Sequence, residues 1–115
     1  MEPLFDKEVG IRYCGGETGL FREVLTVFEH ELEKLIPELK QLYEEKNWKN
    51  YTVRTHGLKN SAMTVGAVSL SQESKKMEFA GKEERYEDIM QAFSDYYGLM
   101  EQTLQLIREY LREGQ

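Results

Sequence analysis

Apolar residues recur at intervals of three and four along nearly the whole chain, which is the spacing of amphipathic α-helices. The pattern is clearest between Thr18 and Lys46, where the apolar stripe consists of Phe21, Val24, Leu25, Phe28, Leu32, Leu35, Ile36, Leu39, Leu42 and Tyr43. The alternation of apolar and polar residues that is typical of half-buried strands is absent. The sequence therefore predicts an all-α protein.

Capping residues and glycines divide this pattern into five predicted helices. Asp6 and Asn47 are suitable N-caps, whereas Gly15-Gly16, Gly66 and Gly81 are typical of helix ends. With these boundaries, the predicted helices span residues 6–13, 18–46, 48–65, 68–80 and 84–112.

Four of these helices are long and amphipathic, and the connections between them are short. This pattern predicts an antiparallel up-down four-helix bundle, with the short N-terminal helix as a lid. A kink or a break is expected at Pro37, because proline removes a backbone hydrogen bond from a helix interior. The 115 residues suit one domain with one core, which would span residues 1–115.

Composition argues against several classes of function. The formal net charge is −6, whereas a surface that binds nucleic acid is basic. No apolar run approaches the roughly 18 residues of a membrane span, and no signal peptide is expected. The single cysteine, Cys14, excludes an internal disulfide and suits a reduced, cytoplasmic setting. The expected partner is a protein or a small molecule, without nucleic-acid or membrane contact.

The predicted helix 48–65 carries a histidine on its polar side. At roughly 100° per residue, one narrow arc of this helix must face the core, and it consists of Tyr51, Leu58, Ala62 and Val65. His56 falls on the opposite side, together with Lys59, Asn60 and Met63. Lys59 lies one turn away, and Gly57 next to the ring costs roughly 1 kcal/mol of helix stability. An exposed ring nitrogen with a neighbouring cation suits the transfer of an anionic group between proteins.

The residues around His56 resemble a known family. The segment RTHGLKNSA, residues 54–62, is followed by Val65-Gly66-Ala67, Leu70 and Met77-Glu78. This order resembles the histidine-containing phosphotransfer (HPt) domains of bacterial two-component phosphorelays, whose usual run is A-H-x-L-K-G-S/A-A. Similar upstream landmarks extend the resemblance over most of the chain, and they are residues 13–16, Leu20-Phe21, Phe28 and Asn47-Trp48. Asn60 departs from the pattern, because the family most often has glycine there.

The resemblance implies a phosphoryl carrier without kinase activity of its own. His56 would accept a phosphoryl group from the aspartyl phosphate of one receiver domain and relay it to another receiver domain. Lys59 would stabilise the phosphoryl oxygens, and Glu78 would accept a hydrogen bond from Nδ1–H, so that Nε2 is the nucleophile. The partner-docking residues would be Val53, Gly57, Asn60, Met63 and Lys75.

The resemblance also implies the partners, which are response-regulator receiver domains and a hybrid sensor histidine kinase, with the chain itself a monomer. The Mg²⁺ ion belongs to the receiver domain, so no cofactor is expected here. No pair of histidines stands at metal-ligand spacing, so no metal site is predicted. Lys75 lies one turn before Glu78, and an ion pair between these two residues is expected.

Two other readings of the chain stay open at this point. One is a helical binding module without phosphotransfer, in which His56 is ordinary surface. The other is a passive bundle that dimerises through an apolar face left over after folding. The presence of both His56 and Lys59 argues against the first. Glu78 has its own alternative, as a solvated residue near a helix end, and His30 is expected to be solvated.

Overall fold

The computed structural model describes residues 3–113, and this part of the chain consists of helices and short connections. The helices are α1 (Lys7–Tyr13), α2 (Thr18–Glu44), α3 (Trp48–Thr64), α4 (Val68–Lys82) and α5 (Tyr86–Glu113). The prediction of an all-α protein is confirmed, and α2, α3 and α4 begin at the predicted residues. Within residues 3–113, no helix is both long enough and apolar enough to cross a membrane.

Side-chain caps explain where α1 and α3 begin. A carboxylate oxygen of Asp6 accepts a hydrogen bond from the backbone N–H of Glu8 at 3.1 Å. The side-chain oxygen of Asn47 accepts one from the backbone N–H of Asn50 at 3.3 Å. The first N–H groups of a helix have no partner inside it, so each cap satisfies a donor that would otherwise need water. Both predicted N-caps are confirmed.

The turn between α3 and α4 depends on Gly66. Its φ is +86°, in the left-handed region that favours glycine. Its carbonyl oxygen accepts a hydrogen bond from the backbone N–H of Asp6 at 2.8 Å, and a Cβ at this position would overlap the Asp6 carbonyl oxygen. The turn is therefore held against the segment that precedes α1, and α4 starts beside the end of α3.

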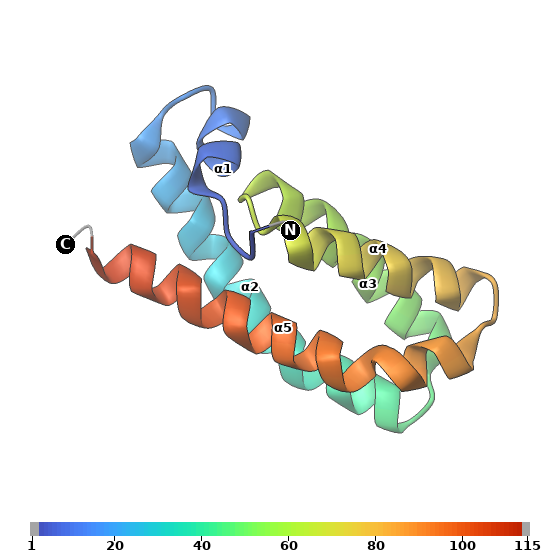
Figure 1. Cartoon of the computed structure of the whole chain (residues 1–115). Coiled ribbons are helices and arrows are strands. Elements are labelled where there is room, and N and C mark those ends of the chain that lie inside the picture. The colour runs from blue at the N-terminus through green and yellow to red at the C-terminus, as the bar shows by residue number, and fades with distance from the viewer. Residues whose placement is uncertain (1–2, 114–115) are drawn as a thin grey trace.

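The four long helices pack in a ring. α2 packs on α3, α3 on α4, α4 on α5 and α5 on α2, whereas α1 packs on α2 and α3. The contact between α3 and α4 is the most extensive, and Figure 1 shows these two helices side by side. The predicted core face of α3 is confirmed, because the residues on it are at most 3% exposed: Tyr51, Leu58, Ala62 and Val65.

Two residues that usually interrupt helices lie inside helices here. α2 continues through Pro37 to Glu44 and is not broken. The core packing of Ile36 and Leu39 on either side outweighs the roughly 3 kcal/mol that an interior proline costs. α4 runs past Gly81, so the predicted end at that glycine is wrong. A Cβ on Gly81 would overlap the Thr52 hydroxyl, so this glycine allows α4 to lie close to α3.

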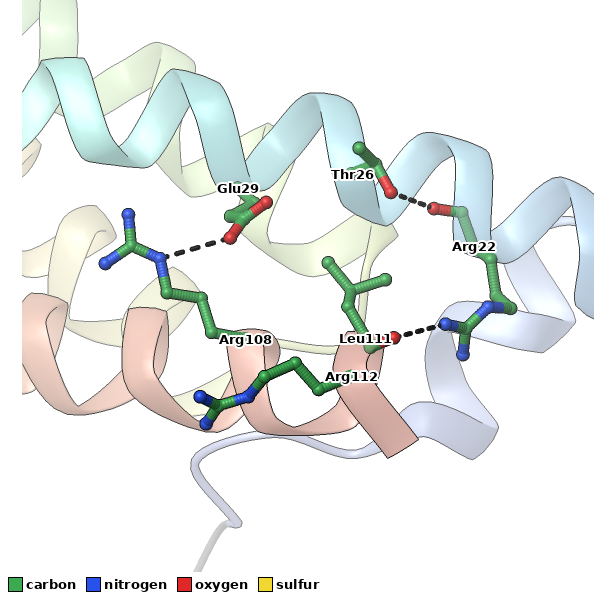
Figure 2. Close-up of a pocket in the computed structure, with 6 residues that line it drawn as sticks. All are labelled: Arg22, Thr26, Glu29, Arg108, Leu111 and Arg112. Atoms are coloured by element: carbon green, nitrogen blue, oxygen red, sulfur yellow. Dashed lines mark hydrogen bonds and ion pairs between the residues drawn. The ribbon is translucent and has the colours of Figure 1, made fainter. Parts of the chain in front are cut away.

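Arginine side chains join α2 to α5, as Figure 2 shows. Arg22 of α2 donates to the Leu111 carbonyl oxygen at 2.6 Å, near the end of α5. Arg108 of α5 pairs with Glu29 at 3.1 Å and with Glu33 at 2.7 Å, both on α2. A hollow of about 350 Å³ lies between the two helices, and its lining consists of Arg22, Thr26, Glu29, Arg108, Leu111 and Arg112. Two of its three guanidinium groups are thus engaged in holding the helices together.

Candidate functional site

His56 lies on the outer face of α3, opposite the buried arc of that helix. Its side chain is 54% exposed, whereas Leu58, two residues further along, is buried in the core. The backbone of Gly57 beside the ring leaves open space where a Cβ would stand. The imidazole is therefore accessible to a partner, as the helical wheel predicts.

Small side chains between α3 and α4 bring a second residue to this histidine. Gly81 lies directly against Thr52, and the hydroxyl of Ser71 donates to the backbone carbonyl of Lys59 at 2.7 Å. Large side chains at these positions would separate the two helices. Because α4 lies so close, Glu78 reaches the imidazole ring from the neighbouring helix, with Oε2 2.6 Å from His56 Nδ1.

Glu78 is a buried carboxylate with three cationic or polar donors around it. The residue is only 3% exposed. Oε1 accepts from Lys59 Nζ at 2.8 Å, whereas Oε2 lies 2.6 Å from His56 Nδ1 and 2.9 Å from Lys82 Nζ. A buried charge is stable only when it is paired and hydrogen-bonded, and this one is. Glu78 is therefore not a solvated residue near a helix end.

The protonation state of Glu78 determines which nitrogen of His56 carries its hydrogen. Burial alone would raise the pKa of Glu78, but hydrogen bonds from Lys59, Lys82 and His56 outweigh burial and lower it to about 2. At neutral pH the carboxylate is ionised and can only accept. The hydrogen in this bond must therefore belong to Nδ1. A neutral imidazole held in this way has its lone pair on Nε2.

The lowered pKa of Glu78 predicts a loss of stability in acid. An unfolded glutamate has a pKa near 4.5, so this group stabilises the folded state above that pH. The contribution is lost as the pH falls from about 4.5 towards 2, and its upper bound is roughly 3 kcal/mol. Urea unfolding followed by circular dichroism at pH 5, 4, 3 and 2 measures this change in free energy of unfolding.

Two variants separate this effect from general acid denaturation. Glu78→Gln removes the titrating group, so its stability should fall less between pH 5 and pH 2 than that of the parent chain. Glu83→Gln removes an exposed carboxylate just beyond α4 and should follow the parent. Equal acid sensitivity in the parent and in Glu78→Gln would mean that the three hydrogen bonds to Glu78 do not persist in solution.

The lysines that contact Glu78 are not the ones that the sequence predicted. Lys59 Nζ contacts Glu78, and the Lys59 side chain is only 25% exposed, so it does not point freely into solvent. Among residues 3–113, the ionic partners of Glu78 are His56, Lys59 and Lys82, so the expected pair with Lys75 is wrong. Sequence reasoning missed Lys82, although its spacing of four residues from Glu78 was the available signal. Because the helix was predicted to end before Gly81, Lys82 was not expected to lie on the same helix as Glu78.

A groove of about 550 Å³ between α2 and α3 opens beside His56. Two of the predicted docking residues, Val53 and Gly57, line it together with the histidine. Asn60 and Met63 are not part of its lining, and they share the outer face of α3 with His56. The α2 side of the groove was not predicted, and it consists of Phe28, Glu31, Leu32, Lys34, Leu35 and Glu38. The buried Phe28 and Leu32 make the floor of the groove apolar, and charged side chains such as Glu31 and Lys34 line its edge.

Metal-ligating residues do not gather anywhere in the described part of the chain. Within residues 3–113, no group of three or more His, Cys, Asp or Glu side chains could hold a metal ion. The groups around Glu78 are an exposed imidazole, that of His56, and two ammonium groups, those of Lys59 and Lys82.

Comparison with known proteins gives two matches. The family model described as "Hpt domain" matches residues 23–113. The phosphorelay intermediate protein rdeA of Dictyostelium discoideum is 23% identical over 106 residues, which are 92% of this chain and 42% of that protein. The chain thus spans less than half the length of this relative. No solved structure matches the chain. The relative does not come from a bacterium, so the bacterial setting of the resemblance remains a prediction.

Proposed function

The chain belongs to the HPt domain family, and on that basis we propose that His56 accepts a phosphoryl group from the aspartyl phosphate of one receiver domain and passes it to the aspartate of another. The observation that supports this most is the hydrogen bond between His56 Nδ1 and the ionised Glu78, which leaves a lone pair on Nε2 of a side chain that is 54% exposed. Histidine phosphotransfer in a phosphorelay is the function of this family, and its members are phosphocarriers.

The proposed transfer follows from that arrangement. Nε2 attacks phosphorus, the N–P bond forms, and the P–O bond to the donor aspartate breaks, so the aspartate leaves as a carboxylate. The imidazole ring then carries positive charge, which the hydrogen bond from Nδ1–H to Glu78 stabilises. Attack by the aspartate of a second receiver domain reverses these steps and returns a neutral ring with its lone pair on Nε2.

Lys59 is proposed to stabilise the phosphoryl oxygens during both transfers. Its ammonium group has three N–H donors, and the contact with Glu78 at 2.8 Å uses only one of them. The other donors remain for the oxygens of a phosphoryl group on the neighbouring turn. The Mg²⁺ ion would come with the receiver domain, and the chain would need no cofactor and no ATP site.

The receiver domain is proposed to dock over the groove between α2 and α3 and over the outer face of α3. Val53 is 54% exposed and offers apolar surface, while Gly57 gives close access to the ring. Asn60, Met63 and Lys75 would complete the contact around the histidine. We infer a monomer of one HPt domain over residues 1–115, with the long helices antiparallel. It would act in the cytoplasm, with a hybrid sensor histidine kinase upstream.

Incubation with a receiver domain tests this proposal. A receiver is phosphorylated beforehand with labelled acetyl phosphate and Mg²⁺, freed of excess donor, and mixed with the purified chain. Label should move to the chain as a phosphate that is labile in acid and stable in base, which is the behaviour of phosphohistidine. If no receiver of the source organism transfers label, the chain is a binding module without phosphotransfer.

The Lys59→Ala variant measures the contribution of the ammonium group to transfer. We expect transfer to slow by roughly a hundredfold, the usual effect of removing one preorganised donor from a transition state. The helical circular dichroism signal should persist, because Glu78 keeps two of its three partners. Lys76→Ala removes an exposed lysine on α4 that has no part in the proposed docking surface, and it is the matched control. Transfer at the parental rate by Lys59→Ala would exclude the proposed role.

A further inference from the structure

Lys82 has a contact that the proposed function does not yet use. It is the last residue of α4, and its Nζ lies 2.9 Å from Glu78 Oε2, four residues earlier on the same helix. The same oxygen lies 2.6 Å from His56 Nδ1. Building on the proposed function, we propose that Lys82 is a positioning residue for phosphotransfer, which weakens the hydrogen bond between His56 and Glu78 by sharing its acceptor oxygen.

The argument begins with how Glu78 divides its two oxygens. Oε1 is occupied by Lys59, so Oε2 is the oxygen that Lys82 and the imidazole have in common. An ammonium group beside a carboxylate oxygen draws negative charge towards itself and makes that oxygen a poorer acceptor for a second donor. Removal of Lys82 would leave Oε2 to His56 alone and strengthen the bond from Nδ1–H.

Orientation of Glu78 does not require Lys82. The carboxylate is buried, and Lys59, whose side chain is 25% exposed, fixes Oε1 from α3. The Lys82 side chain is 64% exposed and lies at the end of its helix. Its hydrogen bond also contributes to the low pKa of Glu78, which fits a charge effect. We therefore expect Lys82 to act on the charge of Oε2 and not on its position.

Other charged groups surround the site but do not contact Oε2. Lys75 lies one turn before Glu78 on α4 and makes no ion pair with it among the described residues. Across the groove, Arg54 of α3 pairs with Glu38 of α2, and Glu31 and Lys34 line the same groove. Substitution of Lys75 therefore changes the local potential without changing the hydrogen bonds of Glu78, which makes it the control for Lys82.

Nuclear magnetic resonance of the unphosphorylated chain tests the proposal. The chemical shift of the His56 Hδ1 proton moves downfield as its hydrogen bond strengthens, and ring nitrogen shifts report the tautomer. We expect Lys82→Met to move Hδ1 downfield, with Lys82→Arg and Lys75→Met close to the parent. An unchanged Hδ1 shift in Lys82→Met would overturn the proposal. Loss of the hydrogen-bonded Hδ1 signal would overturn it too, because Lys82 would then hold Glu78 in place.

Transfer kinetics give the functional half of the test. A stronger hydrogen bond at Nδ1 makes Nε2 a better nucleophile, whereas loss of any nearby lysine weakens attraction for an incoming phosphoryl group. With phosphoramidate as a small donor that needs no docking surface, comparison with Lys75→Met isolates the first effect, and Lys82→Met should accept phosphoryl groups a few-fold faster than that control. Equal rates in the two variants would overturn the proposed role in transfer. Because the resonance measurement needs no phosphate, failure of the proposed function would leave its result unaffected.

Discussion

Replacement of His56 by glutamine is expected to abolish phosphorylation of the chain by every receiver domain. A glutamine amide has no nucleophilic lone pair on nitrogen, so no N–P bond can form at this position. Its N–H can still donate to Glu78, the buried carboxylate that His56 contacts at 2.6 Å. The fold should therefore survive the substitution. Labelled phosphate retained on the chain after separation from the receiver measures the effect.

The second histidine of the chain supplies the control for this experiment. His30 is exposed on α2, and the sequence contains no histidine besides these two. His30→Gln should accept phosphate at the parental rate, and its phosphate should show the same lability in acid. Label on His56→Gln, or its disappearance from His30→Gln, would move the phosphorylation site away from His56.

Replacement of Leu58 by aspartate is expected to destabilise the protein severely. Leu58 is 3% exposed and lies on the core face of α3, two residues from the phosphorylation site proposed here. The variant loses the burial of a leucine side chain, which alone costs roughly 2–5 kcal/mol, and places a carboxylate among apolar groups. Because small domains unfold with a free energy of only about 5–15 kcal/mol, much of the population should be unfolded. Urea titration at 222 nm measures the loss.

Val53→Asp is the matched substitution on the same helix. Val53 is 54% exposed, so an aspartate there stays in water and should change the free energy of unfolding by roughly 0.5 kcal/mol or less. It should weaken receiver binding, because Val53 lies in the proposed docking surface. If Leu58→Asp unfolded at the urea concentration of the parent, α3 would be rotated about its axis relative to the structure described above.

Local sequence signals predicted the helices well, because helix formation depends on residues three and four apart. The starts of α2, α3 and α4, and the caps at Asp6 and Asn47, all follow from such neighbours. The same periodicity placed Leu58 in the core and His56 outside it.

Local signals failed where packing between helices outweighs them. Glycine usually ends a helix, but Gly81 lies inside α4 because Thr52 of α3 occupies the space of its missing side chain. Proline usually breaks a helix, but Pro37 does not, because buried residues on either side hold α2 together. Neither the fit of Gly81 against Thr52 nor the core packing around Pro37 can be inferred from neighbouring residues in the chain.

The sequence by itself determined the all-helical class, the buried faces of α2 and α3, and the candidate histidine with its lysine one turn away. The family resemblance placed Glu78 of α4 at that histidine, and only the tertiary structure decided which other charged groups meet Glu78. It joined Glu78 to His56, Lys59 and Lys82, and it left Lys75 aside. The physical reason is that the 3.6-residue period fixes only the angles of side chains around one helix axis. The distance between two helices, and therefore which of their side chains meet, depends on small residues such as Gly81 that let the helices approach.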